Sequence, residues 1–217
     1  MNIEIERTNM IKQQLRTGDV LEESILTLFN EIPRHAFVPS HLQHFAYSDM
    51  QIELAHDQKM MTPLEEALLL QAINLSGTET VLEIGTGSGF LTALLSRLSN
   101  KVISIDCFKD FTENAKNKLC QHGCNNVELI TADACLGHLN QPPVDVVIIT
   151  AAIEKITETH RLQVIPGGKL FAIVGKKPIM QGQLHQLSPE GKWSFDVIFE
   201  TCLPSIIENV KQNDFVF

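Results

Sequence analysis

The fold of this chain is decided by the stretch Thr80-Val81-Leu82-Glu83-Ile84-Gly85-Thr86-Gly87-Ser88-Gly89-Phe90. Val81, Leu82 and Ile84 form a short apolar run that is typical of a buried strand. Three alternating glycines follow, and the apolar residues after Gly89 begin a helical pattern. Because glycine lacks a Cβ and accepts positive φ, this order of strand, turn and helix lets a ligand approach bare backbone at a helix N-terminus. An ordinary tight strand-to-helix turn is the alternative interpretation.

The spacing of the glycines distinguishes between classes of ligand. It reads G-x-G-x-G, whereas the dinucleotide fingerprint is G-x-G-x-x-G, and Phe90 stands where the third glycine of that fingerprint would fall. Glu83, two residues before the first glycine, would repel a pyrophosphate and suits a ligand with a cationic amine. A nucleotide-dependent dehydrogenase is therefore disfavoured. The pattern E/D-x-G-x-G-x-G resembles motif I of the S-adenosylmethionine-dependent methyltransferases.

From residue 79 onward the sequence alternates between strand and helix patterns. Strands are expected at 80–84, 101–106, 127–131, 144–150 and 169–174, and helices at 88–99, 109–122 and 154–164. The nearly continuous apolar run Val144–Ile149 indicates a parallel sheet that is covered on both faces. Two further strand-like runs, around 183–187 and 194–202, flank Gly191 and predict an antiparallel pair at the sheet edge. The expected fold is thus α/β and Rossmann-like, with a mostly parallel central sheet.

The N-terminal part of the chain reads as helical. Apolar positions predict helices over 3–17 and 21–32, the second ending before Pro33. Thr62-Pro63-Leu64-Glu65 has the pattern of a capping box with proline at the first helical position, so another helix is expected to begin there. We expect residues 1–60 to form a helical appendage on the substrate side and 61–217 the cofactor-binding domain, together one structural unit.

Composition narrows the class of protein. The formal net charge of -9 and the pI near 5.3 argue against a nucleic-acid partner, which would need a basic surface. The charged N-terminus lacks the apolar core of a signal peptide, and no apolar run is long enough to predict a membrane span. The five cysteines form no C-x-x-C pair and suit a cytoplasmic protein. The sequence leaves the oligomeric state open.

Several polar residues stand where strands of the predicted sheet begin or end. Asp106 ends the strand 101–106 about twenty residues after the first glycine, the offset at which a carboxylate meets a ribose diol, although it also suits a helix N-cap. Asp133 fits a contact with the adenine edge or a surface turn. Asp145 is expected to be structural, whereas Thr150 at the far end of the same strand faces the predicted site.

The eight histidines do not predict a metal site. His41-x-x-His44, with His35 and His56 nearby, lacks both the paired cysteines of a structural zinc site and the H-E-x-x-H pattern. Neither G-x-S-x-G nor a cysteine–histidine signature is present, so the sequence does not support covalent hydrolase chemistry.

Over nearly its full length the chain resembles the protein-L-isoaspartate O-methyltransferase family. The matching segments are Arg7…Met10…Gln14-Leu15, Ile32-Pro33-Arg34-His35-Ala36-Phe37-Val38-Pro39, Ala46-Tyr47-Ser48-Asp49, Val81–Phe90, Asp145…Thr150-Ala151-Ala152 and Gln163…Pro166-Gly167-Gly168-Lys169-Leu170…Val174-Gly175. The resemblance implies a class I methyltransferase fold. It also implies methyl esterification of isoaspartyl sites in aged proteins, as a step of their repair. The implied S-adenosylmethionine site comprises Glu83, Gly85, Thr86, Gly87, Gly89, Asp106, Cys107, Asp133, Ala134 and Thr150.

The substrate loop departs from the family pattern. The family usually reads G-Q-T-I-S-x-P, whereas this chain reads Asp57-Gln58-Lys59-Met60-Met61-Thr62-Pro63. Met61 takes the position of the serine whose hydroxyl lies beside the reaction, and Thr62 follows one residue later, where it is also the expected helix cap. We take Met61 and Thr62 as the residues at the catalytic position. Two alternatives remain open: a methyltransferase with another acceptor, and a protein that only binds the cofactor.

Overall fold

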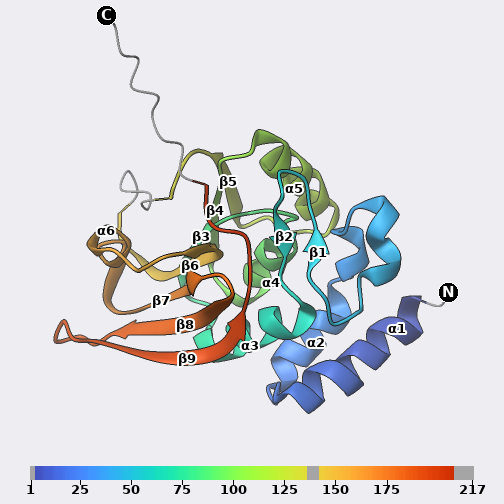
Figure 1. The fold of residues 1–217 in the computed structure, drawn as a ribbon, viewed down its shortest axis with the longest axis horizontal. Coiled ribbons are helices and arrows are strands. Elements are labelled where there is room, and N and C mark those ends of the chain that lie inside the picture. The colour runs from blue at the N-terminus through green and yellow to red at the C-terminus, as the bar shows by residue number, and fades with distance from the viewer. Residues whose placement is uncertain (1–2, 136–141, 208–217) are drawn as a thin grey trace, which may run out of the picture.

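The computed structural model describes residues 3–135 and 142–207, and its centre is a seven-stranded sheet (Figure 1). The strand order is β5-β4-β3-β6-β7-β8-β9. The strands are β3 (Thr80–Ile84), β4 (Lys101–Asp106), β5 (Val127–Thr131), β6 (Val144–Ile153), β7 (Val164–Lys176), β8 (Ile179–Leu187) and β9 (Trp193–Thr201). Pairing is parallel from β5 to β7 and antiparallel from β7 to β9. This confirms the predicted mostly parallel sheet with an antiparallel edge.

Helices form around this sheet where the sequence places apolar stripes. They are α1 (Ile3–Met10), α2 (Glu23–Glu31), α3 (Pro63–Ile73), α4 (Phe90–Leu98), α5 (Lys109–Gln121) and α6 (Glu158–Arg161). Short 3-10 segments occupy Arg16–Gly18, Arg34–Ala36 and Ser40–Phe45, and a π-helical turn occupies Ile11–Leu15. A separate hairpin pairs β1 (Ile52–Glu53) with β2 (Lys59–Met60).

Two predicted helices differ from those observed. The segment 3–17 is not one α-helix, because α1 gives way to the π-helical turn at Ile11 and then to a 3-10 turn. The segment 154–164 contains only the short α6, which Thr157 caps at its start. At the other end of the segment β7 already begins at Val164, where it pairs with Val144. Pairing with a neighbouring strand therefore shortened a helix that local pattern alone had extended.

The two faces of the sheet bury separate apolar clusters because side chains alternate along each strand. Val81, Val102 and Ile148 join the larger cluster, which also contains apolar residues of α2, α3, α4 and α5. Leu82 and Ile103 belong to the smaller cluster on the other face. The N-terminal helices thus share a core with the sheet, while the division of the chain at residue 60 stays a prediction.

Within the described residues, no helix combines the length and the apolar character that a membrane crossing requires. The same part of the chain contains no cluster of three or more His, Cys, Asp or Glu side chains that could bind a metal ion.

Candidate functional site

The glycine turn after β3 has a backbone conformation that residues with a side chain could adopt only under strain. Gly85 has a φ of 103°, and a Cβ added there would lie 2.2 Å from Thr150 Oγ1. The Thr150 hydroxyl donates hydrogen bonds to the carbonyls of Ile84 and Gly85, at 3.1 and 2.9 Å. Gly89, with a φ of 84°, is the N-cap of α4. The turn is therefore fixed by the end of β6 and leaves backbone exposed beside a helix N-terminus.

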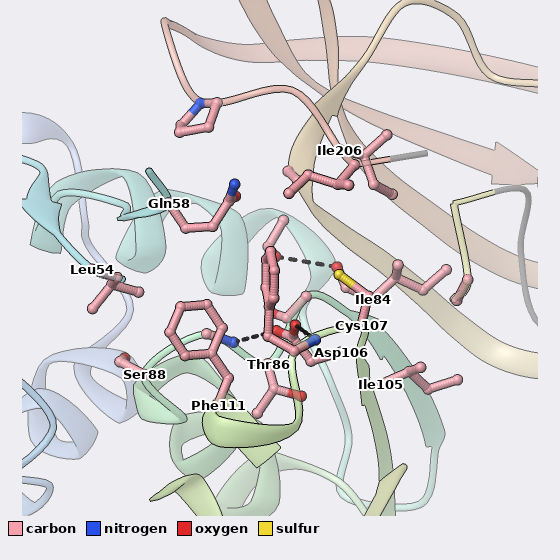
Figure 2. Close-up of a pocket in the computed structure, with 18 of the residues that line it drawn as sticks. Leu54, Gln58, Ile84, Thr86, Ser88, Ile105, Asp106, Cys107, Phe111 and Ile206 are labelled. Atoms are coloured by element: carbon pink, nitrogen blue, oxygen red, sulfur yellow. Dashed lines mark hydrogen bonds between the residues drawn. The ribbon is translucent and has the colours of Figure 1, made fainter. Parts of the chain in front are cut away.

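A large cavity opens at the carboxyl ends of the parallel strands (Figure 2). It encloses about 880 Å³, its open mouth included, which is the size expected of a site for a nucleoside-sized ligand. The ends of β3, β4 and β6 line it, together with residues that follow β5, the hairpin β1–β2 and the segment 204–207. Figure 2 shows Leu54 and Gln58 reaching in from the hairpin, across the cavity from Asp106 and Cys107. Ligands of open α/β sheets bind at such strand ends.

Asp106 joins the glycine turn to the segment that follows β4. Its Oδ2 accepts a hydrogen bond from the Gly87 amide and its Oδ1 one from the Phe108 amide, both at 2.9 Å. Burial raises the pKa of Asp106, and the two backbone donors oppose that rise. Asp106 is not the N-cap of α5, because that position belongs to Phe108. Its carboxylate lines the cavity, where it remains available to a ribose diol.

The side of the cavity formed by the segments after β4 and β5 combines small, apolar and acidic residues. Cys107, Asp133 and Ala134 line it. All three are among the residues that the family resemblance implies for the cofactor site. Asp133 Oδ1 accepts a hydrogen bond from the Cys135 amide at 3.0 Å, so this carboxylate is held at the end of β5. Phe108 and Phe111 add aromatic surface, which suits the face of a purine base.

Glu83 does not line the cavity, although the sequence suggests that its carboxylate meets a cationic amine. The side chain is fully buried, and its Oε2 accepts hydrogen bonds from Thr92 and Ser104, both at 2.6 Å. Its Oε1 accepts no hydrogen bond from the residues that the structure describes. Burial raises the pKa of Glu83 to about 7, against the effect of the two hydroxyl donors. Gly89 also lies outside the lining, whereas Gly85, Thr86, Gly87 and Thr150 belong to it.

The substrate loop separates the two residues at the catalytic position. Met61 is buried and lines the cavity, whereas Thr62 does not line it. The Thr62 hydroxyl accepts from the Glu65 amide at 3.2 Å, and the Glu65 carboxylate accepts from the Thr62 amide at 2.7 Å. This confirms the predicted capping box, which is worth about 0.5–2 kcal/mol of stability. Asp57, with a φ of 56°, adopts the left-handed backbone that explains a family glycine at this position.

Sequence reasoning missed a buried ion pair beside this loop. Glu66 is 3% exposed, lines the cavity and pairs with Arg34, which is 1% exposed. The available signal was the spacing, because Glu66 precedes Leu70 by four residues and therefore shares the buried face of α3. No comparable pattern indicates the position of His56, whose ring packs on Phe108 at the hairpin tip.

Comparison with known proteins places these features in a family. A family model described as Protein-L-isoaspartate(D-aspartate) O-methyltransferase (PCMT) matches residues 5–200. The chain belongs to this family. A protein-L-isoaspartate O-methyltransferase of Syntrophus aciditrophicus is 37% identical over 174 residues, which cover 80% of each chain. That of Methanoculleus marisnigri is 33% identical over 172 residues, covering 79% of this chain and 78% of the relative.

Solved structures agree with this family fold. A putative protein-L-isoaspartate O-methyltransferase from Plasmodium falciparum, crystallised with S-adenosyl-L-homocysteine, superimposes with a TM-score of 0.79 at 16% identity. The match covers 94% of this chain and 99% of that one. At this identity the superposition shows a shared fold, the class I methyltransferase fold that the protein-L-isoaspartate O-methyltransferase family implies.

Proposed function

We propose that this chain is an S-adenosylmethionine-dependent methyltransferase that esterifies the free carboxylate of isoaspartyl residues in proteins. The observation that carries the proposal is the glycine turn joined to Asp106 at the mouth of the cavity, in a chain that belongs to the protein-L-isoaspartate O-methyltransferase family. The acceptors are aged proteins, so the reaction serves their repair. A cytoplasmic location, where the five free thiols suit a reducing compartment, is part of the same proposal, as is the absence of a nucleic-acid partner.

The residues of the cavity fit this cofactor. Asp106 offers two carboxylate oxygens to a ribose diol. Gly85 belongs to the same lining, where its missing Cβ lets the turn pack against Thr150. Phe108 and Phe111 offer aromatic surface to the base, beside Asp133. When bound, S-adenosylmethionine supplies a methyl group on a sulfonium, whose sulfur leaves as a neutral thioether.

The protein's share of the chemistry is orientation. An isoaspartyl carboxylate is already ionised at pH 7, so no side chain must remove a proton before its oxygen attacks the methyl carbon. With the cofactor bound, the new C–O bond would form as the C–S bond broke, and the bonding pair would stay on sulfur. Holding the reactants in line, about 3–3.5 Å apart and away from water, can lower a barrier by roughly 7–11 kcal/mol. Met60 and Met61 supply buried apolar surface for this purpose.

A second acceptor class is favoured by one observation. Met61 puts a buried thioether where the family places a hydroxyl, so a polar contact with the isoaspartyl group is missing. Such a site also suits an acceptor with an apolar group beside its carboxylate.

The test is a methyl-transfer assay with labelled S-adenosylmethionine, run on an isoaspartyl peptide and on its normal aspartyl counterpart. We expect label on the isoaspartyl peptide alone. Cofactor binding without transfer to either peptide would favour the second acceptor class. Absence of cofactor binding would remove the methyltransferase assignment itself.

A further inference from the structure

Glu66 is the carboxylate on the α3 side of the cavity. The charged residues among the described lining are three carboxylates, Glu66, Asp106 and Asp133, and one cation, Lys59. Asp106 and Asp133 lie at the ends of β4 and β5, whereas Glu66 belongs to α3, which packs against β7, β8 and β9. The sheet order separates β4 and β5 from those strands, and Figure 1 shows α3 beside β9 and away from β5. Glu66 therefore lies away from the nucleoside side of the cavity.

The Glu66 side chain is held in a fixed position by Arg34. The two residues form a buried ion pair, and Arg34 Nη2 also donates to the Met61 carbonyl at 2.6 Å. The Arg34 guanidinium lies 5.0 Å from the ring centroid of Phe90, which restricts it further. Only Glu66 Oε2 bonds to Arg34, so the carboxylate keeps acceptor capacity on its cavity side.

The buried charges of the described residues are unbalanced. Glu66, Glu83 and Asp106 are buried acids among the described residues, whereas Arg34 is the one buried arginine or lysine there. Burial raises the pKa of Glu66 to about 8 although Arg34 opposes the rise, and the charges of Glu65 and Glu83 raise it further. A second positive charge beside Glu66 would relieve this imbalance, because an opposite charge within a few ångströms stabilises the ionised carboxylate.

We propose that the Glu66 carboxylate binds the ammonium group of the cofactor's amino-acid moiety. The inference rests on the proposed function, in which Asp106 and Asp133 hold the nucleoside. With the nucleoside at the ends of β4 and β5, the part of the cavity left for the amino-acid end of the same ligand includes the part that Met61 and Glu66 line. Glu66 thus takes the role that the sequence pattern suggests for Glu83, whose carboxylate faces Thr92 and Ser104 instead.

Comparison of three ligands shows which of the cofactor's two positive groups, the sulfonium or the ammonium, contacts Glu66. S-Adenosylmethionine carries both the sulfonium and the ammonium, S-adenosylhomocysteine keeps only the ammonium, and 5′-methylthioadenosine lacks the amino-acid moiety altogether. Calorimetry with each ligand on the wild type, Glu66→Gln and Glu65→Gln isolates the contact. Glu65→Gln is the matched control, since Glu65 is the neighbouring acid of α3, lies outside the cavity lining and keeps its capping role as glutamine.

We expect Glu66→Gln to weaken binding of S-adenosylmethionine and S-adenosylhomocysteine alike, by about 10- to 100-fold, the scale of one charge-assisted hydrogen bond. Binding of 5′-methylthioadenosine should not change. Glu65→Gln should not weaken binding of any of the three ligands, because loss of the Glu65 charge favours the ionised form of Glu66. Unchanged affinity for S-adenosylhomocysteine would overturn the proposal, as would a loss confined to S-adenosylmethionine, which would assign Glu66 to the sulfonium. Equal loss for all three ligands would show that the substitution only deforms the cavity.

The substitution leaves Arg34 unpaired, so a second variant guards against a folding defect. Arg34→Met/Glu66→Met removes both buried charges, and apolar replacement of a buried ion pair is often tolerated. We expect this variant to show the same selective loss for the two ligands that carry an ammonium. If the wild type binds none of the three ligands, the proposed function fails, and that outcome is distinct from failure of the Glu66 assignment.

Discussion

The imidazole ring of His56 lies flat on the ring of Phe108, with ring centroids 3.8 Å apart and planes 4° from parallel. His56 Nε2 is also 3.0 Å from Asp110 Oδ1 at the start of α5. His56 is at the tip of the hairpin β1–β2, and Phe108 directly precedes α5. The contact therefore fastens the hairpin, which lines one side of the cavity, to the segment that lines the other.

We expect His56→Ala to speed cofactor release. An aromatic pair contributes about 0.5–1.5 kcal/mol, so the dissociation rate of S-adenosylhomocysteine should rise roughly 2- to 10-fold. Stopped-flow measurement of ligand displacement checks this rate. His41→Ala, at an exposed histidine in the Ser40–Phe45 segment, is the control and should behave as the wild type. A rate in His56→Ala equal to that of the control would show that the hairpin does not limit release.

Asp106 has two functions that substitutions can separate. Asp106→Ala removes both the ribose contact and the acceptors of the Gly87 and Phe108 amides, so calorimetry should show cofactor affinity falling by more than tenfold. Asp106→Asn keeps one acceptor oxygen and should give an intermediate affinity. If Asp106→Ala bound S-adenosylhomocysteine as tightly as the wild type, Asp106 would not belong to the site.

Met61→Ser tests whether the altered loop still serves an isoaspartyl acceptor. If the missing hydroxyl only weakens orientation of the substrate, its return should raise isoaspartyl methyl transfer by about 10- to 100-fold, as one hydrogen bond to a charged group allows. Met60→Ser is the matched control, because Met60 is equally buried and lines the same cavity. An equal gain in both variants would point to added space rather than to the hydroxyl. With no transfer in the wild type or in Met61→Ser, despite normal cofactor binding, the isoaspartyl assignment would be lost.

Glu83 should make the folded state less stable as the pH rises. Burial raises its folded-state pKa to about 7, above the value of an exposed glutamate, so the folded chain holds this proton more tightly than the unfolded chain. Its stabilising contribution is thus complete below about pH 4.5 and is lost as the pH rises through about 7. In urea titrations between pH 5 and 8, Glu83→Gln should lose less unfolding free energy than the wild type. Glu66 acts in the same direction in both proteins. Identical pH slopes would contradict a buried, protonated Glu83.

Local patterns predicted those features whose causes lie within a few residues. The capping box at Thr62 is one such feature, because its two hydrogen bonds join residues three apart. The strand, glycine turn and helix around Gly85 are another, since the apolar run favours a strand and the glycines accept the positive φ values of the turn. The predicted length of the helix at 154–164 was wrong, because part of its cause lies far away in the sequence. The strand β7 begins at Val164, where it pairs with Val144 of β6.

The sequence by itself thus determined the α/β fold, the glycine turn and the position of Asp106 at a strand end. Only the tertiary structure decided which carboxylates face the cavity. Glu83 is next to the glycines in sequence, yet its side chain turns toward Thr92 and Ser104. Glu66 belongs to α3, which begins after the substrate loop, and its side chain lines the cavity. There it pairs with Arg34, which comes from a different part of the chain. Alternation along β3 places Glu83 on the same face as Val81. The hydroxyl groups that this face meets belong to α4 and β4, and they become adjacent to Glu83 only once the chain has folded.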